Sequence, residues 1–235
     1  MIPALRERPE GGARVDTSSP ASRALAHDAL LRGAGGAALA VRSAAVFAFF
    51  GVESFLPLAL STVRGASAAE VASILTLSAL AWTAGAFVQA RACRGWSARD
   101  LTRAGTLGLV AGIACATLGL FEPTPIAVAL AGWTLAGFGM GVVYSTATAS
   151  AMDAAPAGAE GAAGSALGIA DAVAAGLATA LGGVFVAAAP LAAGETPLWL
   201  VAAFALAALV GSTGWLDPAR YCLAIPTRAS AVGSR

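Results

Sequence analysis

Long apolar stretches dominate this chain, and short polar connections separate them. Each stretch has at least the roughly 17 to 25 residues that a helix needs to cross about 30 Å of hydrocarbon. Continuous apolar runs predict helices, since the strands of a membrane barrel alternate apolar and polar residues over short segments. The chain is therefore predicted to be an all-α integral membrane protein with six transmembrane helices, at residues 37–62, 71–90, 104–121, 125–152, 162–189 and 196–216.

Both ends of the chain lack such a stretch. Residues 1–36 are rich in arginine, proline, glycine and serine, and residues 20–32 are predicted to form a short amphipathic helix leading to the membrane. Residues 217–235 are predicted to form a polar tail.

Hydrophobic residues make up 58% of the chain and charged residues 11%, against about 25% charged in a typical soluble domain. This composition excludes a water-soluble fold.

The basic residues are all arginine, and their distribution orients the predicted spans. Six precede the first apolar run, the last of them being Arg42; four lie between the second and third spans, and three follow the sixth. Only Arg64 falls on the opposite side. Arginine and lysine concentrate in cytoplasmic loops, so both termini are predicted to be cytoplasmic in a multi-pass protein of the plasma membrane.

Two acidic residues, Glu53 and Asp171, lie inside predicted spans. A charge at bilayer depth is costly and usually marks a substrate, ion or proton pathway. Glu53 lies 11 residues after Arg42, and Asp171 lies 11 residues after Glu160. Both are therefore predicted to lie at similar depth, roughly 15 Å inside the cytoplasmic boundary, as a proton or ion coupling site. The alternative for Glu53 is a structural carboxyl group hydrogen-bonded to a neighbouring helix.

Polar residues within the spans occur in the first, second, fourth and fifth, and these four spans are predicted to surround a central cavity. Trp133, Met140 and Tyr144 share one face of the fourth span. With Trp82 and Thr83 of the second span, they are candidates for contact with an amphipathic substrate. Plain helix packing is the alternative for all five residues.

Small residues and one proline predict how the helices pack. Pro57 is expected to interrupt the first span and to free a backbone carbonyl near Glu53. Glycines spaced four residues apart allow close contact between helix backbones, and they occur at Gly108 and Gly112, Gly137 and Gly141, and Gly164 and Gly168.

No motif for a metal, a cofactor or catalysis is recognisable. Cys93, Cys115 and Cys222 are widely spaced, and His27 is the only histidine. The sequence also lacks a phosphate-binding G-x-x-x-x-G-K-[ST] motif, and its charge is balanced. We therefore expect no cofactor, no metal site, no enzymatic activity and no nucleic-acid partner.

The run GFGMGVVYSTATASAMDAAPAGAEGAAGSALGIADAVAAGLATALGG resembles helices of actinobacterial, drug-efflux-type members of the major facilitator superfamily (MFS). The resemblance covers about residues 30–216 and fits the C-terminal six-helix half of such a transporter. The loop after the second span is similar to a weakened family signature, G-x-x-x-D-R-x-G-R-R. Gly85, Arg91 and Arg94 fit it, whereas Gln89 replaces the acid.

The resemblance implies a transporter, or half of one, that exports small amphipathic molecules in proton-coupled antiport. Members of the family contain two six-helix halves, so the implied partners are the lipid bilayer, a small-molecule substrate and a second half. That half would be another copy of this chain or a separately encoded chain. The alternative is a truncated or non-transporting membrane subunit with only a structural role.

Overall fold

The computed structural model describes residues 33–155 and 158–188, and these residues are helical apart from short connections. Within these residues, five spans are long and apolar enough to cross a membrane. Helices α2 and α3 together make one of them, over Gly35–Arg64. Residues 1–32, the predicted sixth span and the predicted tail lie outside the described part. The helices are α2 (Gly33–Glu53), α3 (Leu56–Arg64), α4 (Ala68–Ala92), α5 (Ala98–Leu118), α6 (Ile126–Ala154) and α7 (Glu160–Ala188).

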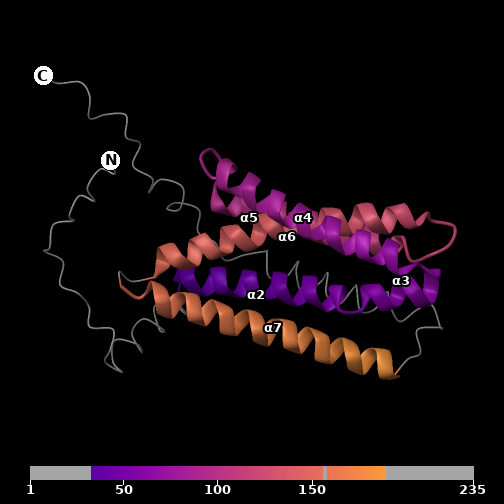
Figure 1. Cartoon of the computed structure of the whole chain (residues 1–235). Helices are drawn as coiled ribbons and strands as arrows, with labels where there is room; N and C mark the ends of the chain where they lie inside the picture. The colour runs from indigo at the N-terminus through magenta and orange to yellow at the C-terminus, as the bar shows by residue number, and fades with distance from the viewer. Residues whose placement is uncertain (1–32, 156–157, 189–235) are drawn as a thin grey trace, which may run out of the picture.

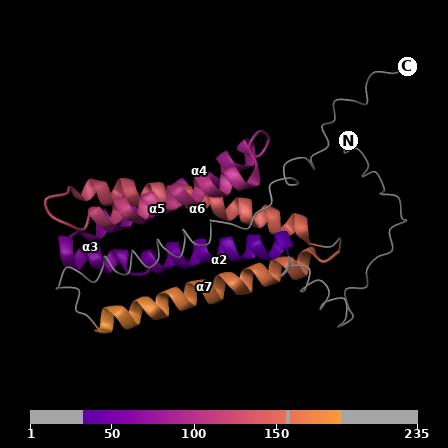
Figure 2. The ribbon, with the colours of Figure 1, turned by 180° about the vertical axis from the view of Figure 1, so that it is seen from behind.

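Helix α6 is the centre of the described bundle. It packs extensively against α5 and α4 and also against α2, whereas α7 packs mainly against α2. Figure 1 shows α2 running between α7 on one side and the group formed by α4, α5 and α6 on the other, and the reverse view in Figure 2 gives the same order. Helix α7 is thus attached to the rest of the described bundle almost entirely through α2.

Glycines allow α6 to be packed so closely from two sides. A Cβ atom at Gly112 of α5 would overlap the backbone of Ala136, and one at Gly141 of α6 would overlap the Trp82 carbonyl group. The predicted small-residue pairs of the third and fourth spans therefore lie at helix contacts, as expected. The prediction is wrong for α7 within the described residues, because a Cβ atom at Gly168 would meet nothing within 4 Å.

The first span is interrupted at the predicted proline. Helix α2 ends at Glu53, and α3 begins at Leu56 with Pro57 in its first turn. The N–H of Phe55 donates to the Val52 carbonyl at 3.1 Å, a tighter turn than an α-helix makes. Since proline has no N–H group, it cannot bond to the Glu53 carbonyl. The break therefore places an acidic side chain beside interrupted backbone.

Local polar contacts fix the connections between spans. Ser67 and Glu70 form a capping box at the start of α4, and the side chain of Ser97 accepts a hydrogen bond from the backbone N–H of Asp100 at the start of α5. At the end of α3, Arg64 donates to the Thr124 carbonyl at 2.8 Å. This contact ties the first span to the connection between α5 and α6.

Replacing Gly112 by alanine tests the close packing of α5 on α6. The added methyl group meets backbone that cannot rotate away, so we expect a loss of about 1–3 kcal/mol in the free energy of unfolding. The measurement is denaturant unfolding of the purified protein in detergent. Gly168→Ala is the matched control and should cost nothing, because its surroundings are open. Equal stabilities of the two variants would contradict this packing.

Candidate functional site

Arg42 lies inside the first span rather than before it. Helix α2 begins at Gly33, so more than two helical turns precede the arginine, and only 6% of Arg42 is exposed. Its assignment to the group of arginines that flank the membrane is therefore wrong. Arg42 lies near the start of the predicted span, residues 37–62, so its position in the sequence alone did not distinguish a flanking charge from a buried one.

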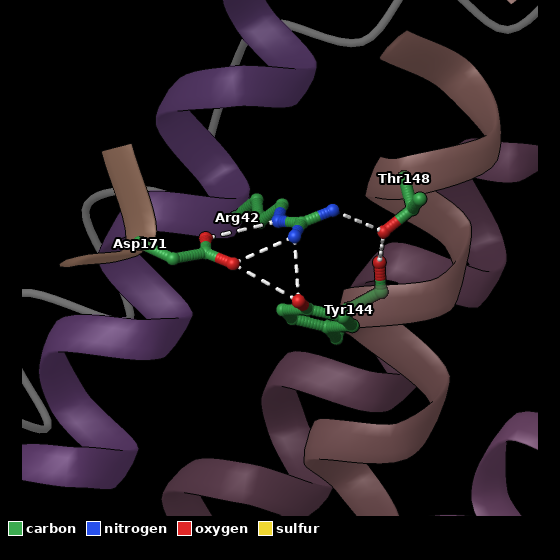
Figure 3. Close-up of polar contacts among 4 residues, drawn as sticks. All are labelled: Arg42, Tyr144, Thr148 and Asp171. Carbon is green, nitrogen blue, oxygen red and sulfur yellow. Dashed lines mark hydrogen bonds and ion pairs between the residues drawn. The ribbon is translucent and has the colours of Figure 1, made fainter. Parts of the chain in front are cut away.

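The guanidinium group of Arg42 forms a bidentate ion pair with Asp171 of α7 (Figure 3). Its Nε lies 3.0 Å from Oδ1 of Asp171, and its Nη2 lies 2.6 Å from Oδ2. Nη2 also donates to the Tyr144 hydroxyl at 2.5 Å, and Nη1 donates to Oγ1 of Thr148 at 2.6 Å. The Tyr144 hydroxyl in turn donates to Asp171 at 2.9 Å.

These four residues, called the Arg42 cluster below, join three helices: α2 supplies Arg42, α6 supplies Tyr144 and Thr148, and α7 supplies Asp171. The guanidinium carbon also lies 4.0 Å from the centre of the Tyr144 ring. Opposite charges and several hydrogen bonds offset the large cost of holding a guanidinium group away from water. The cluster is therefore neutral as a unit, with one positive and one negative charge held together by hydrogen bonds.

Glu53 and Asp171 do not lie at the same depth, which corrects the prediction from the sequence. Asp171 is level with Arg42, to which it is hydrogen-bonded. Ser54, next to Glu53, is level instead with Thr179, which lies further along α7, and the hydroxyl oxygens of Ser54 and Thr179 are 3.1 Å apart. Arg42 and Glu53 are separated by about 16 Å along the helix axis, at 1.5 Å per residue. The two acids therefore belong to separate sites.

Glu53 is the last residue of α2 and is half-buried. Within the described residues, its carboxylate has no hydrogen-bond or ion-pair partner. It lies at the backbone break before Pro57. An unpaired acid at such a position contrasts with the fully paired Asp171.

An aromatic cluster separates these two polar positions. Phe49 stacks on Trp133, with ring centres 4.8 Å apart, and meets Trp82 edge-on at 5.3 Å. Trp82 also meets Tyr144 edge-on at 5.4 Å. Phe49 was missed in the sequence because it is one of several apolar residues in its span. Its spacing of seven residues from Arg42 was the available signal, since that spacing returns to the same helix face.

The other predicted cavity residues have different surroundings. Trp133 and Met140 are fully buried in the core, and the indole N–H of Trp133 has no acceptor among the described residues. Trp82 and Tyr144 are half-buried. Thr83 is exposed on α4 and donates to the Ala79 carbonyl of its own helix at 3.2 Å. The structure thus brings Trp82, Trp133 and Tyr144 together and leaves Thr83 apart.

The predicted loop residues lie at the end of α4, away from these clusters. Gln89 is buried, whereas Arg91 and Arg94 are exposed. The guanidinium carbon of Arg91 lies 4.8 Å from the centre of the Phe87 ring.

A groove of about 580 Å³ runs between α4 and α6. Its lining is almost entirely apolar, including Leu77, Leu130 and Phe138, and it contains no member of the Arg42 cluster. The groove is therefore not part of the polar site. Among residues 33–155 and 158–188, no group of three histidine, cysteine or acidic side chains is arranged to hold a metal ion.

A bundle of apolar helices with a buried ion-pair cluster is typical of a multi-pass membrane protein with a polar centre. Comparison with protein families gives a match to the model described as Major Facilitator Superfamily over residues 3–183. The chain belongs to this family of membrane transporters. Searches of curated proteins and of solved structures gave no match.

Removing either charge of the ion pair should destabilise the protein unequally. Asp171→Asn leaves a buried guanidinium group that cannot lose its proton, and we expect a loss of about 3–5 kcal/mol in the free energy of unfolding. Arg42→Gln should cost less, because Asp171 is more exposed than Arg42 and keeps the Tyr144 hydroxyl group as a hydrogen-bond donor. Unfolding in detergent of both single variants and the double variant gives the coupling energy. Additive losses, without coupling, would argue against the pair.

Proposed function

We propose that this chain is a proton-coupled transporter, or one half of a transporter, that exports small amphipathic molecules across the plasma membrane. The observation that supports this most is the Arg42 cluster. A purely structural bundle gains little from a buried ion pair, since apolar residues of similar volume often stabilise a fold as well or better. Membership of a transporter family supports a role of the cluster in transport.

In this proposal, the ion pair controls how α7 is held. Arg42 and Asp171 link α2 to α7, and α7 makes few other contacts with the described bundle. A proton or substrate that changes the charge at Asp171 therefore weakens the attachment of α7 to α2. A transporter that opens alternately to the two sides of the membrane needs a contact that differs between its two conformations. A ligand shifts the equilibrium between two conformations only if it interacts differently with each of them.

Glu53 is the proposed carrier of the exchanged proton. Its carboxylate is half-buried and lacks a partner in the described part of the chain, so it can gain and lose a proton without breaking an ion pair. Asp171 is proposed to respond to that step through Arg42, since a direct contact between the two acids is excluded by their separation along α2.

The aromatic cluster is the proposed contact surface for the apolar part of the substrate. Trp82 and Tyr144 would touch the substrate, because both are half-buried, while Trp133 and Met140 would support them from the core. Large aromatic faces accept varied amphipathic molecules without strict geometry. The positive charges of Arg91 and Arg94 support cytoplasmic termini, because arginine and lysine concentrate in cytoplasmic loops.

A second six-helix half is proposed to cover α4 and α7. Less of each of these helices is buried than of the other three spans, and both expose large apolar side chains. Leu80 of α4 is 62% exposed, and Ile169 of α7 is 66% exposed. Two halves of similar orientation can enclose a central site, which one half alone cannot do. The partner would be another copy of this chain or a separate chain.

Glu53→Gln tests the coupling role. In proteoliposomes with an imposed proton gradient, we expect substrate-driven proton movement, read with an internal pH dye, to fall to background. The helical content should stay unchanged, since glutamine keeps the size and polarity of the side chain. Glu122→Gln is the control, because Glu122 is exposed in the connection between α5 and α6. Unchanged proton movement in Glu53→Gln would remove the coupling role.

If the purified chain moves neither substrate nor protons even when its partner is supplied, the alternative of a non-transporting subunit gains support. The satisfied hydrogen bonds of the Arg42 cluster fit that alternative also.

Cysteine cross-linking tests where the second half packs. In a background without native cysteines, cysteine at Leu80 or Ile169 should give cross-linked dimers in membranes if the partner is another copy of the chain. Leu107 of α5 is the matched control, since it is also 62% exposed but lies on a helix outside the proposed interface. Equal cross-linking from all three positions would indicate random collision instead.

A further inference from the structure

The connection between α4 and α5 carries the densest positive charge of the described residues. Arg91, Arg94, Arg99 and Arg103 lie within it or in the adjoining helical turns, against one acid, Asp100. We call residues 91–103 the arginine loop. The Asp100 carboxylate already accepts a hydrogen bond from the Ser97 hydroxyl at 2.6 Å in the helix cap. The loop therefore carries a clear excess of positive charge.

Three of these arginines, Arg91, Arg94 and Arg103, have no acidic partner in the described part of the chain. The guanidinium groups of Arg94 and Arg103 have no hydrogen bond or ion pair there, and Arg91 lies only over the Phe87 ring. In Figure 1, the arginine loop lies at the same end of the bundle as the connection between α6 and α7. The acids at that connection, Asp153 and Glu160, form no ion pair with it.

Aromatic side chains accompany the exposed arginines. Phe87 is 60% exposed on the last turns of α4, and Trp96 is 56% exposed in the loop. Indole rings favour the level of the lipid headgroups, and an arginine near a helix end extends its charge toward the same level. The guanidinium carbon of Arg91 lies 4.8 Å from the centre of the Phe87 ring, so charge and aromatic surface adjoin at this end of α4.

We propose that the arginine loop is a binding surface for the headgroups of anionic phospholipids, with Arg91, Arg94 and Arg103 supplying the charge and Trp96 the interfacial anchor. Each arginine near an anionic membrane surface should strengthen the binding of the loop to that surface about five-fold. The unpaired charges of Arg91, Arg94 and Arg103 together with exposed aromatic rings favour a lipid surface as the binding partner. An acidic protein segment would satisfy the charges but leave Phe87 and Trp96 in water. This inference does not depend on the proposed transport activity.

Energy transfer from Trp96 to labelled lipid tests the proposal. The full chain is reconstituted in phosphatidylcholine vesicles that contain phosphatidylglycerol, with a trace of either lipid carrying a dansyl group on its acyl chain. Subtracting the signal of Trp96→Phe isolates the transfer from this tryptophan. We expect several-fold more transfer to the anionic lipid at equal mole fraction, and less difference as NaCl is raised.

The charge variant is Arg91→Gln/Arg94→Gln/Arg103→Gln, which should lose the preference. Arg64→Gln is the control and should keep it, because Arg64 is held by Thr124 at the end of α3. Equal transfer to both lipids in the unchanged protein, or a preference kept by the triple variant, would overturn the proposal.

Two further measurements use the unchanged protein, so they hold even if the triple variant fails to insert. A preference that does not respond to NaCl would exclude a surface built on charge. Inorganic phosphate at matched ionic strength should lower the preference for anionic lipid no more than NaCl does. A stronger effect would show that the loop binds free phosphate instead, and would also overturn the proposal.

Discussion

A guanidinium group inside a membrane span must find an opposite charge and several acceptors, and in this protein Asp171, Tyr144 and Thr148 supply them to Arg42. The requirement decides the placement of α7, which contacts the bundle mainly through α2. It also fixes the rotation of α6, whose tyrosine and threonine must face the arginine. The arrangement of three helices thus follows from satisfying one buried charge.

Close packing around α6 makes this geometry possible. Lipid tails are as apolar as the helix surfaces, so helix contacts in a membrane depend on how closely backbones can approach. Gly112 and Gly141 allow α5 and α4 to lie directly against α6. With those two faces occupied, the remaining packed face of α6 holds Tyr144 toward α2. The glycines therefore position the polar cluster although they take no part in its chemistry.

The polar features lie at three levels along the bundle, and each level has a different chemistry. The arginine loop lies at one end, the Arg42 cluster holds an ion pair, and Glu53 lies at the helix break without a polar partner among the described residues. Phe49 and its aromatic neighbours separate the last two. This separation supports different roles for the two acids, since a proton cannot pass directly from one carboxylate to the other.

The membrane class, the helical nature of the described spans, the approximate positions of the first five spans and the interruption at Pro57 could all be predicted from the sequence. These features depend on local composition and on the covalent structure of proline. The sequence also indicated Glu53, Asp171, Trp82 and Tyr144 as unusual residues for a membrane interior. The packing of helices distant in the chain was needed to show that Arg42 is buried, that it pairs with Asp171, and that Glu53 lies elsewhere. The partners are 129 residues apart in the chain, and no local pattern encodes which helix faces meet. That choice depends on the packing of α2, α6 and α7 as a whole.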